Sequence, residues 1–113
     1  MALRCQTEDE KIVALLHDVI EDTDITIEYL RQVGFSQTIT DAVEALTKIE
    51  GEDYMMFIER VSFNDLAVFV KIQDLKYNMD ISRLNGKPHW KIDIYQKALS
   101  FLETRKIQVT KLH

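Results

Sequence analysis

The sequence contains few residues that interrupt helices or that mark a disulfide scaffold. Among 113 residues there are three Gly and one Pro, so few positions force the backbone out of a helix. The single cysteine, Cys5, excludes a disulfide within the chain and is typical of a reducing compartment. Every apolar run is well short of the ~20 residues that a membrane-spanning helix needs. These absences favour an all-helical domain outside the membrane.

The bulk composition predicts one globular domain over residues 1–113. Hydrophobic residues make up 46% of the chain and charged residues 29%, as in ordinary globular proteins. The net charge of −5 argues against non-specific nucleic-acid binding, which needs clustered Lys and Arg, but it is compatible with a small anionic ligand. The N-terminus lacks a signal-peptide pattern, so we expect a cytoplasmic protein.

The first half of the chain has the periodicity of three helices. Thr7 followed by Glu10 forms a capping box at the start of the first. A short second helix is expected over residues 27–33, ended by Gly34, and Ser36 caps the third. Their apolar spacing predicts buried faces for the first and third helices. These faces comprise Ile12, Val13, Leu15, Leu16, Val19 and Ile20, and then Ile39, Ala42, Val43 and Leu46.

The second half predicts up to three more helices. One spans Asp53 to about Val61, and Ser62 with Asp65 forms a second capping-box-like pair that opens the long helix "NDLAVFVKIQDLKYNMDI". The segment "NGKP" at 85–88 is the strongest break in the chain, and an amphipathic helix follows it. The inward residues expected here are Tyr54, Phe57, Ile58 and Val61 in the first helix, and Trp90, Ile94, Ala98, Phe101 and Leu102 in the last.

Four ionisable residues follow an apolar run in "ALLHDVIEDTDIT" (14–26). Residues four apart share a helix face, so His17 lies near Glu21 and Asp18 near Asp22. Imidazole nitrogen and carboxylate oxygen are donors for Mn²⁺, Fe²⁺ or Zn²⁺. Carboxylates are also unfavourable at a helix C-terminus, where the dipole is negative, and a cation would offset them. The alternative is a solvated helix end whose histidine is a core residue.

A second polar group interrupts the long apolar helix. In "VKIQDLKYNMD", Asp74 and Asn78 are four residues apart, and Lys71 lies one turn before Asp74. An unpaired carboxylate on a buried helix face costs several kcal/mol, so Asp74 requires a partner. That partner is either a bound cation or Lys71.

Together, "ALLHDVIEDT", "AVEALTK" and "VKIQDLKYNMD" resemble the motifs of the HD-domain phosphohydrolases. The similarity is greatest to the RelA/SpoT-type hydrolases of guanosine tetraphosphate (ppGpp) and their small single-domain relatives, and it covers about residues 14–84. It implies an all-α helical bundle in which a divalent metal, usually Mn²⁺, activates water. That water removes pyrophosphate from the 3′ position of a guanosine nucleotide.

The resemblance also implies roles for individual residues. His17 and Asp18 match the doublet that ligates the metal, and Asp74 matches a third ligand. Glu21 and Asp22 match the acidic pair that orients or deprotonates the nucleophilic water.

Substrate contacts and one departure lie in the other two motifs. Asn78 matches a residue of the substrate pocket, and Lys48 matches the lysine of the family's "LTK". For Lys48 the alternative is a lysine that simply favours a helix C-terminus. A basic residue that follows the family's ligating aspartate is Leu75 here, with Lys76 one position later.

The largest departure concerns the family's first helices, which this sequence is expected to lack. They carry a further metal-ligating histidine, for which His89 and His113 are not natural substitutes. Without those helices an apolar face would be uncovered, so we expect a homo-oligomer formed through that face. The alternative function is a truncated, non-catalytic HD-fold module that binds nucleotide weakly or serves in protein association.

Overall fold

The computed structural model describes residues 7–84 and 89–112, and among these the side chains of 7–81 and 92–105. The described residues form six helices and no strand, which confirms the predicted all-α class of five to six helices. The helices are α1 (Glu8–Asp22), α2 (Ile27–Gln32), α3 (Gln37–Ala45), α4 (Tyr54–Val61), α5 (Asp65–Leu84) and α6 (His89–Leu112). In the part of the chain described, no helix is both long enough and apolar enough to cross a membrane.

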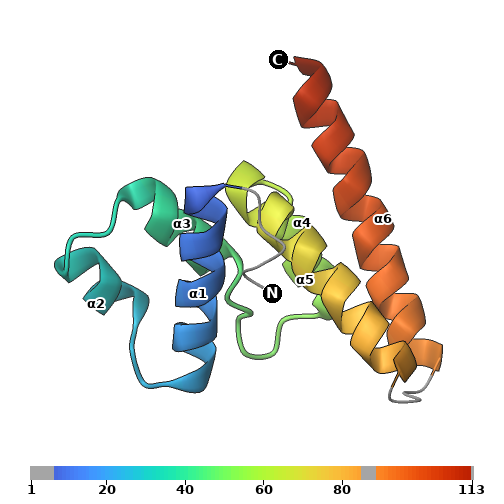
Figure 1. The fold of residues 1–113 in the computed structure, drawn as a ribbon, viewed down its shortest axis with the longest axis horizontal. Helices are drawn as coiled ribbons and strands as arrows, with labels where there is room; N and C mark the ends of the chain where they lie inside the picture. The colour runs from blue at the N-terminus through green and yellow to red at the C-terminus, as the bar shows by residue number, and fades with distance from the viewer. Residues whose placement is uncertain (1–6, 85–88, 113) are drawn as a thin grey trace.

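Helix α5 is the element on which the others assemble (Figure 1). It contacts α1, α3, α4 and α6, whereas α2 packs on α3 at the edge of the molecule. Helix α6 runs back alongside α5 and then extends past it (Figure 1). The fully buried side chains that join these helices include Val13, Val43, Ile58, Val68, Ile72, Leu75 and Leu102. The β-branched stretch of α5 is helical and supplies the centre of the core.

Three of the four predicted helix caps and ends are confirmed, among them Ser36, whose Oγ accepts from Ile39 N at 3.3 Å at the start of α3. Thr7 and Glu10 form the reciprocal capping box, with nitrogen-to-oxygen distances of 3.1 and 3.2 Å. Gly34 has a φ of 105°, and its N–H and that of the next residue donate back into α2 as in a Schellman motif. The predicted cap at Ser62 is wrong: Asn64 Oδ1 accepts from Ala67 N, while Ser62 ends α4.

Two predicted apolar faces differ from those observed. Leu15 is 55% exposed, because α1 instead turns Val13 and His17 inward. On α6, Ile94 and Phe101 are 38% and 42% exposed, and the face against α5 includes Ala98, Leu99 and Leu102. The predicted faces of α3 and α4 do lie inward. The side chain of Trp90 and the "NGKP" segment lie outside the described residues.

Candidate metal centre

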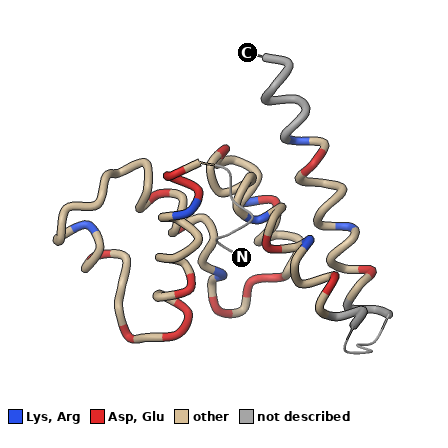
Figure 2. The backbone as a smooth tube through the Cα atoms, viewed as in Figure 1, with Lys and Arg blue, Asp and Glu red and all other residues tan. Residues whose placement is uncertain are grey.

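The C-terminal end of α1 concentrates acidic side chains. The helix ends at Thr23, whose backbone is extended (φ −136°, ψ 178°), while its N–H and its hydroxyl both donate to the carbonyl oxygen of Val19, at 3.0 and 2.6 Å. The last turn has no basic residue, and acidic groups continue into the following turn (Figure 2). Negative charge at this end is opposed by the helix dipole, so a bound cation would stabilise the arrangement.

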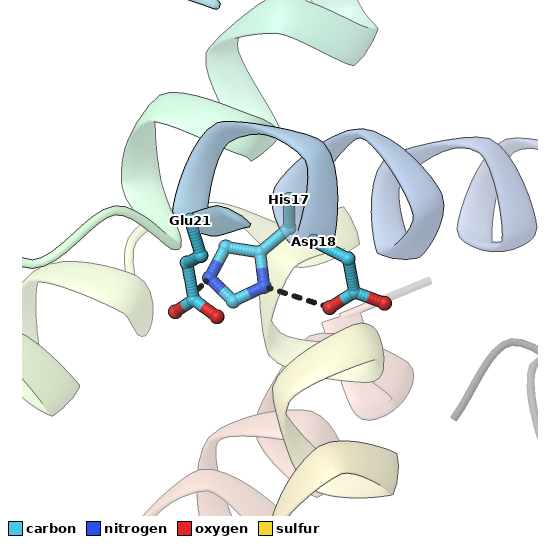
Figure 3. Close-up of side chains that lie close together, drawn as sticks. All are labelled: His17, Asp18 and Glu21. Atoms are coloured by element: carbon cyan, nitrogen blue, oxygen red, sulfur yellow. Dashed lines mark ion pairs between the residues drawn. The ribbon is translucent and has the colours of Figure 1, made fainter. Parts of the chain in front are cut away.

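His17, Asp18 and Glu21 form a compact set of donors on α1 (Figure 3). His17 is only 6% exposed, whereas both carboxylates reach solvent. His17 Nε2 lies 3.1 Å from Glu21 Oε1, and Nδ1 lies 4.0 Å from Asp18 Oδ1. One donor atom from each residue lies within 4.8 Å of the other two. Donors bonded to one metal at about 2.2 Å are at most about 4.4 Å apart, so this set fits a divalent ion after small adjustments.

Glu21 has a specific position relative to the histidine ring. It lies at hydrogen-bonding distance from Nε2, whereas Nδ1 is on the side of Asp18 (Figure 3). Metal-ligating histidines commonly donate their second ring N–H to a carboxylate in this way. Glu21 is therefore placed either to orient His17 or to act as a ligand itself. Asp22, the other predicted acidic residue, is the exposed last residue of α1.

Asp74 belongs to a different group on α5. Lys71 Nζ donates to its Oδ2 at 2.9 Å, and the Asn78 amide nitrogen donates to its Oδ1 at 2.8 Å. The partner that the sequence left open is thus Lys71 in this structure. Asp74 is not one of the three residues whose donor atoms lie within 4.8 Å, although α1 and α5 are in contact. Its role as a metal ligand stays a prediction.

Aromatic side chains surround this second group. Lys71 Nζ lies 5.3 Å from the centroid of the Phe57 ring, and the Tyr54 ring lies 6.1 Å from Phe57 and 6.4 Å from Tyr95. Burial raises the pKa of Tyr54 well above its usual range, and Coulombic interaction with Tyr95 and Asp74 adds to the effect. The Tyr54 hydroxyl therefore stays protonated at neutral pH. The sequence predicted that Tyr54 faces inward but gave no sign that it lies beside Asp74.

Lys48 lies exposed in the loop between α3 and α4. Arg60 holds this loop by donating to the carbonyl oxygens of Glu44, Ala45 and Thr47, at 3.4, 3.3 and 2.8 Å. This role of Arg60 was not predicted from the sequence. Its partners are 13 to 16 residues away and are backbone groups, so no side-chain pattern could reveal it. The arginine satisfies carbonyls that the end of α3 leaves without helical partners.

We expect Arg60→Met to lower the free energy of unfolding by about 2 kcal/mol, because these carbonyls would lose a charged donor. Urea denaturation measures the change. The matched control is Arg31→Met, since the Arg31 guanidinium is 40% exposed and pairs with Asp41 and Glu44 at the surface. It should cost less than about 1 kcal/mol. Equal losses in the two variants would contradict the structural role of Arg60.

The ionisation of Glu52, which lies in this loop, makes the stability of the fold depend on pH. Arg60 donates to both of its carboxylate oxygens at 3.1 Å and holds the pKa of Glu52 below its usual 4.5, with burial opposing and the Ile49 N–H and Lys48 adding to the effect. A carboxyl whose pKa is lower in the folded state stabilises the fold above its unfolded value, and this contribution is lost as the pH falls through the folded value.

The expected result is a pH-dependent difference between wild type and Glu52→Gln. The wild type should be the more stable protein at neutral pH, and its advantage should shrink once the pH falls below 4.5. Urea denaturation from about pH 7 to about pH 3 measures both proteins. An advantage that is constant or grows toward acid would show that the pair with Arg60 does not lower this pKa.

The departure from the family pattern at Leu75 has a structural reason. Leu75 is 1% exposed and belongs to the core, whereas the next residue, Lys76, is exposed. No protein-family model matches the chain, and no curated protein matches it. The observations that point to a function are therefore the donor set of α1 and the resemblance of the motifs.

Proposed function

We propose that this chain is a metal-dependent phosphohydrolase of the HD superfamily that releases pyrophosphate from the 3′ position of a guanosine polyphosphate such as guanosine tetraphosphate. The observation that carries the proposal is the convergence of one imidazole and two carboxylates within 4.8 Å at the end of α1. The ten-residue motif "ALLHDVIEDT" around them supports it, as does the sequence motif "VKIQDLKYNMD" of α5. As part of this proposal we expect the protein to be cytoplasmic.

His17 and Asp18 would hold the ion, with Asp74 as the third ligand. A mixed set of nitrogen and oxygen donors suits Mn²⁺, with Fe²⁺ or Zn²⁺ as alternatives. When bound, such an ion supplies Lewis acidity toward a phosphoryl oxygen and lowers the pKa of water.

The remaining proposed roles belong to side chains around the ion. Glu21 and Asp22 are exposed acids that would orient the attacking water and accept its proton. Lys48 and Asn78 would contact the substrate. Water adds to phosphorus, the bond to the ribose 3′ oxygen breaks, and that oxygen takes up a proton. The products are pyrophosphate and a nucleotide with a free 3′-hydroxyl.

The test is release of pyrophosphate from guanosine tetraphosphate by the purified chain with added Mn²⁺. We expect turnover that EDTA abolishes, together with bound metal measured by elemental analysis. Guanosine 5′-diphosphate, which has no 3′ phosphate, is the matched control and should release none. Absence of both bound metal and turnover would instead favour the non-catalytic module.

Self-association is the remaining part of the proposal. Large apolar side chains are exposed on the described surface, and Phe63 after α4 and Met56 on α4 are the most exposed, at 75% and 62%. Surfaces of this kind are typical of contact sites between chains. A second copy of the chain stays the predicted partner.

A further inference from the structure

Lys71 is a buried cation on the apolar face of α5. Its residue surface is 9% exposed, and its Nζ lies 2.9 Å from Asp74 Oδ2 and 5.3 Å from the centroid of the Phe57 ring. Removing an ammonium group from water is unfavourable unless a partner compensates it. Asp74 is that partner, so the position of the lysine is fixed by the carboxylate that the proposed function assigns to the metal.

Asn78 holds the other oxygen of the same carboxylate. Its amide nitrogen lies 2.8 Å from Asp74 Oδ1 and 2.9 Å from the backbone oxygen of Asp74. The amide is therefore tied to the helix as well as to the carboxylate. If Lys71 lost its charge, Asn78 would still hold Oδ1 of Asp74. The positive charge beside the carboxylate and the orientation of the carboxylate can therefore be altered separately.

We propose that Lys71 is the internal counter-cation of Asp74 and that it limits how tightly the site binds a divalent metal. The proposal rests on the proposed function, because it takes Asp74 to be a ligand. A fixed positive charge next to a ligand oxygen repels an incoming divalent ion and already satisfies part of the carboxylate's charge. Because the lysine is buried, solvent and salt screen this repulsion only weakly.

The experiment is Mn²⁺ titration of Lys71→Met, followed by the electron paramagnetic resonance signal of free Mn²⁺ and by calorimetry. Methionine keeps an apolar stem of similar length and removes the charge, so we expect about tenfold tighter binding or more, which is about 1.4 kcal/mol. Lys71→Arg keeps the charge and should leave the affinity close to wild type. Lys76→Met removes an exposed lysine from the same helix and controls for net charge.

The outcomes separate this proposal from the proposed function. The proposed role of Lys71 is supported if Lys71→Met binds Mn²⁺ more tightly than the wild type while Lys71→Arg and Lys76→Met do not. It is also supported if Lys71→Met is the one variant that binds Mn²⁺ at all. Unchanged or weaker binding in folded Lys71→Met overturns it, and if the wild type still binds Mn²⁺ the proposed function is unaffected. A purely structural role would change the thermal stability and leave the affinity unmoved. If Lys71→Met does not fold, Lys71→Gln is neutral, can still donate to Asp74, and is judged by the same criteria.

Discussion

Asp18→Asn is expected to weaken Mn²⁺ binding by at least about a hundredfold and to reduce pyrophosphate release accordingly. Losing a partner outside the ligand set already costs about 10- to 100-fold, so losing an anionic ligand should cost at least the upper value. Asp18 is half exposed and lies 4.0 Å from the His17 ring, so the substitution should leave the fold intact. Calorimetry measures the affinity, and circular dichroism checks the helix content.

Asp24→Asn is the matched control for this change. It removes one exposed carboxylate from the turn that follows α1 and so alters net charge equally. We expect less than about a threefold change in affinity, because exposed charges are screened. Equal losses in the two variants would mean that the acidic end of α1 attracts cations only diffusely and does not contain a defined site.

Asp74→Ala is expected to abolish Mn²⁺ binding at micromolar protein concentration while α5 stays helical. The proposal makes Asp74 the third ligand, although Lys71 and Asn78 now engage both of its oxygens. Asp80→Ala removes an exposed carboxylate from the same helix and should leave the affinity unchanged. Metal content after dialysis, measured by elemental analysis, distinguishes the two variants. Full metal occupancy in Asp74→Ala would remove Asp74 from the ligand set.

Loss of Asp74 also leaves Lys71 buried without its carboxylate, which destabilises the fold. The double variant Lys71→Met/Asp74→Ala removes both charges and should regain most of the lost stability, because no unpaired charge remains. It should still fail to bind Mn²⁺. Recovery of metal binding in the double variant would show that the single substitution acted through folding.

Local chemistry made some of the fold predictable from the sequence. The capping box of Thr7 and Glu10 and the glycine at position 34 depend on neighbours within four residues, and both are confirmed. The α3 face was also predictable, because its apolar residues occupy one side only. Ser62 was mistaken for the cap of α5 because Ser and Asn are both favoured at that position, and Asn64, two residues later, is the residue that accepts from Ala67 N.

The faces of α1 and α6 depend on contacts that periodicity does not determine. Helix α6 has apolar residues around much of its circumference, so α5 decides which of them are buried. Ile94 and Phe101 consequently face outward while Leu99 is buried. On α1 the apolar stripe is wide enough that Leu15 could be left exposed when His17 turned inward.

The candidate site was predictable where its residues share one helix. His17 and Glu21 meet because they are four residues apart, and Asp18 is adjacent to the ring. The partner of Asp74 was not predictable, since a lysine three residues earlier and a bound cation both satisfy a buried carboxylate. The role of Arg60 was not predicted, because its acceptors are backbone carbonyl oxygens, which every residue has and which a sequence pattern therefore cannot identify.

A crystal structure of the Mn²⁺-loaded chain, with the ion located by anomalous scattering, tests the central claim most directly. We expect one ion bonded to a His17 ring nitrogen, an Asp18 oxygen and an Asp74 oxygen. An ion elsewhere, or one at the end of α1 while Asp74 stays paired with Lys71 beyond bonding distance, would contradict the account.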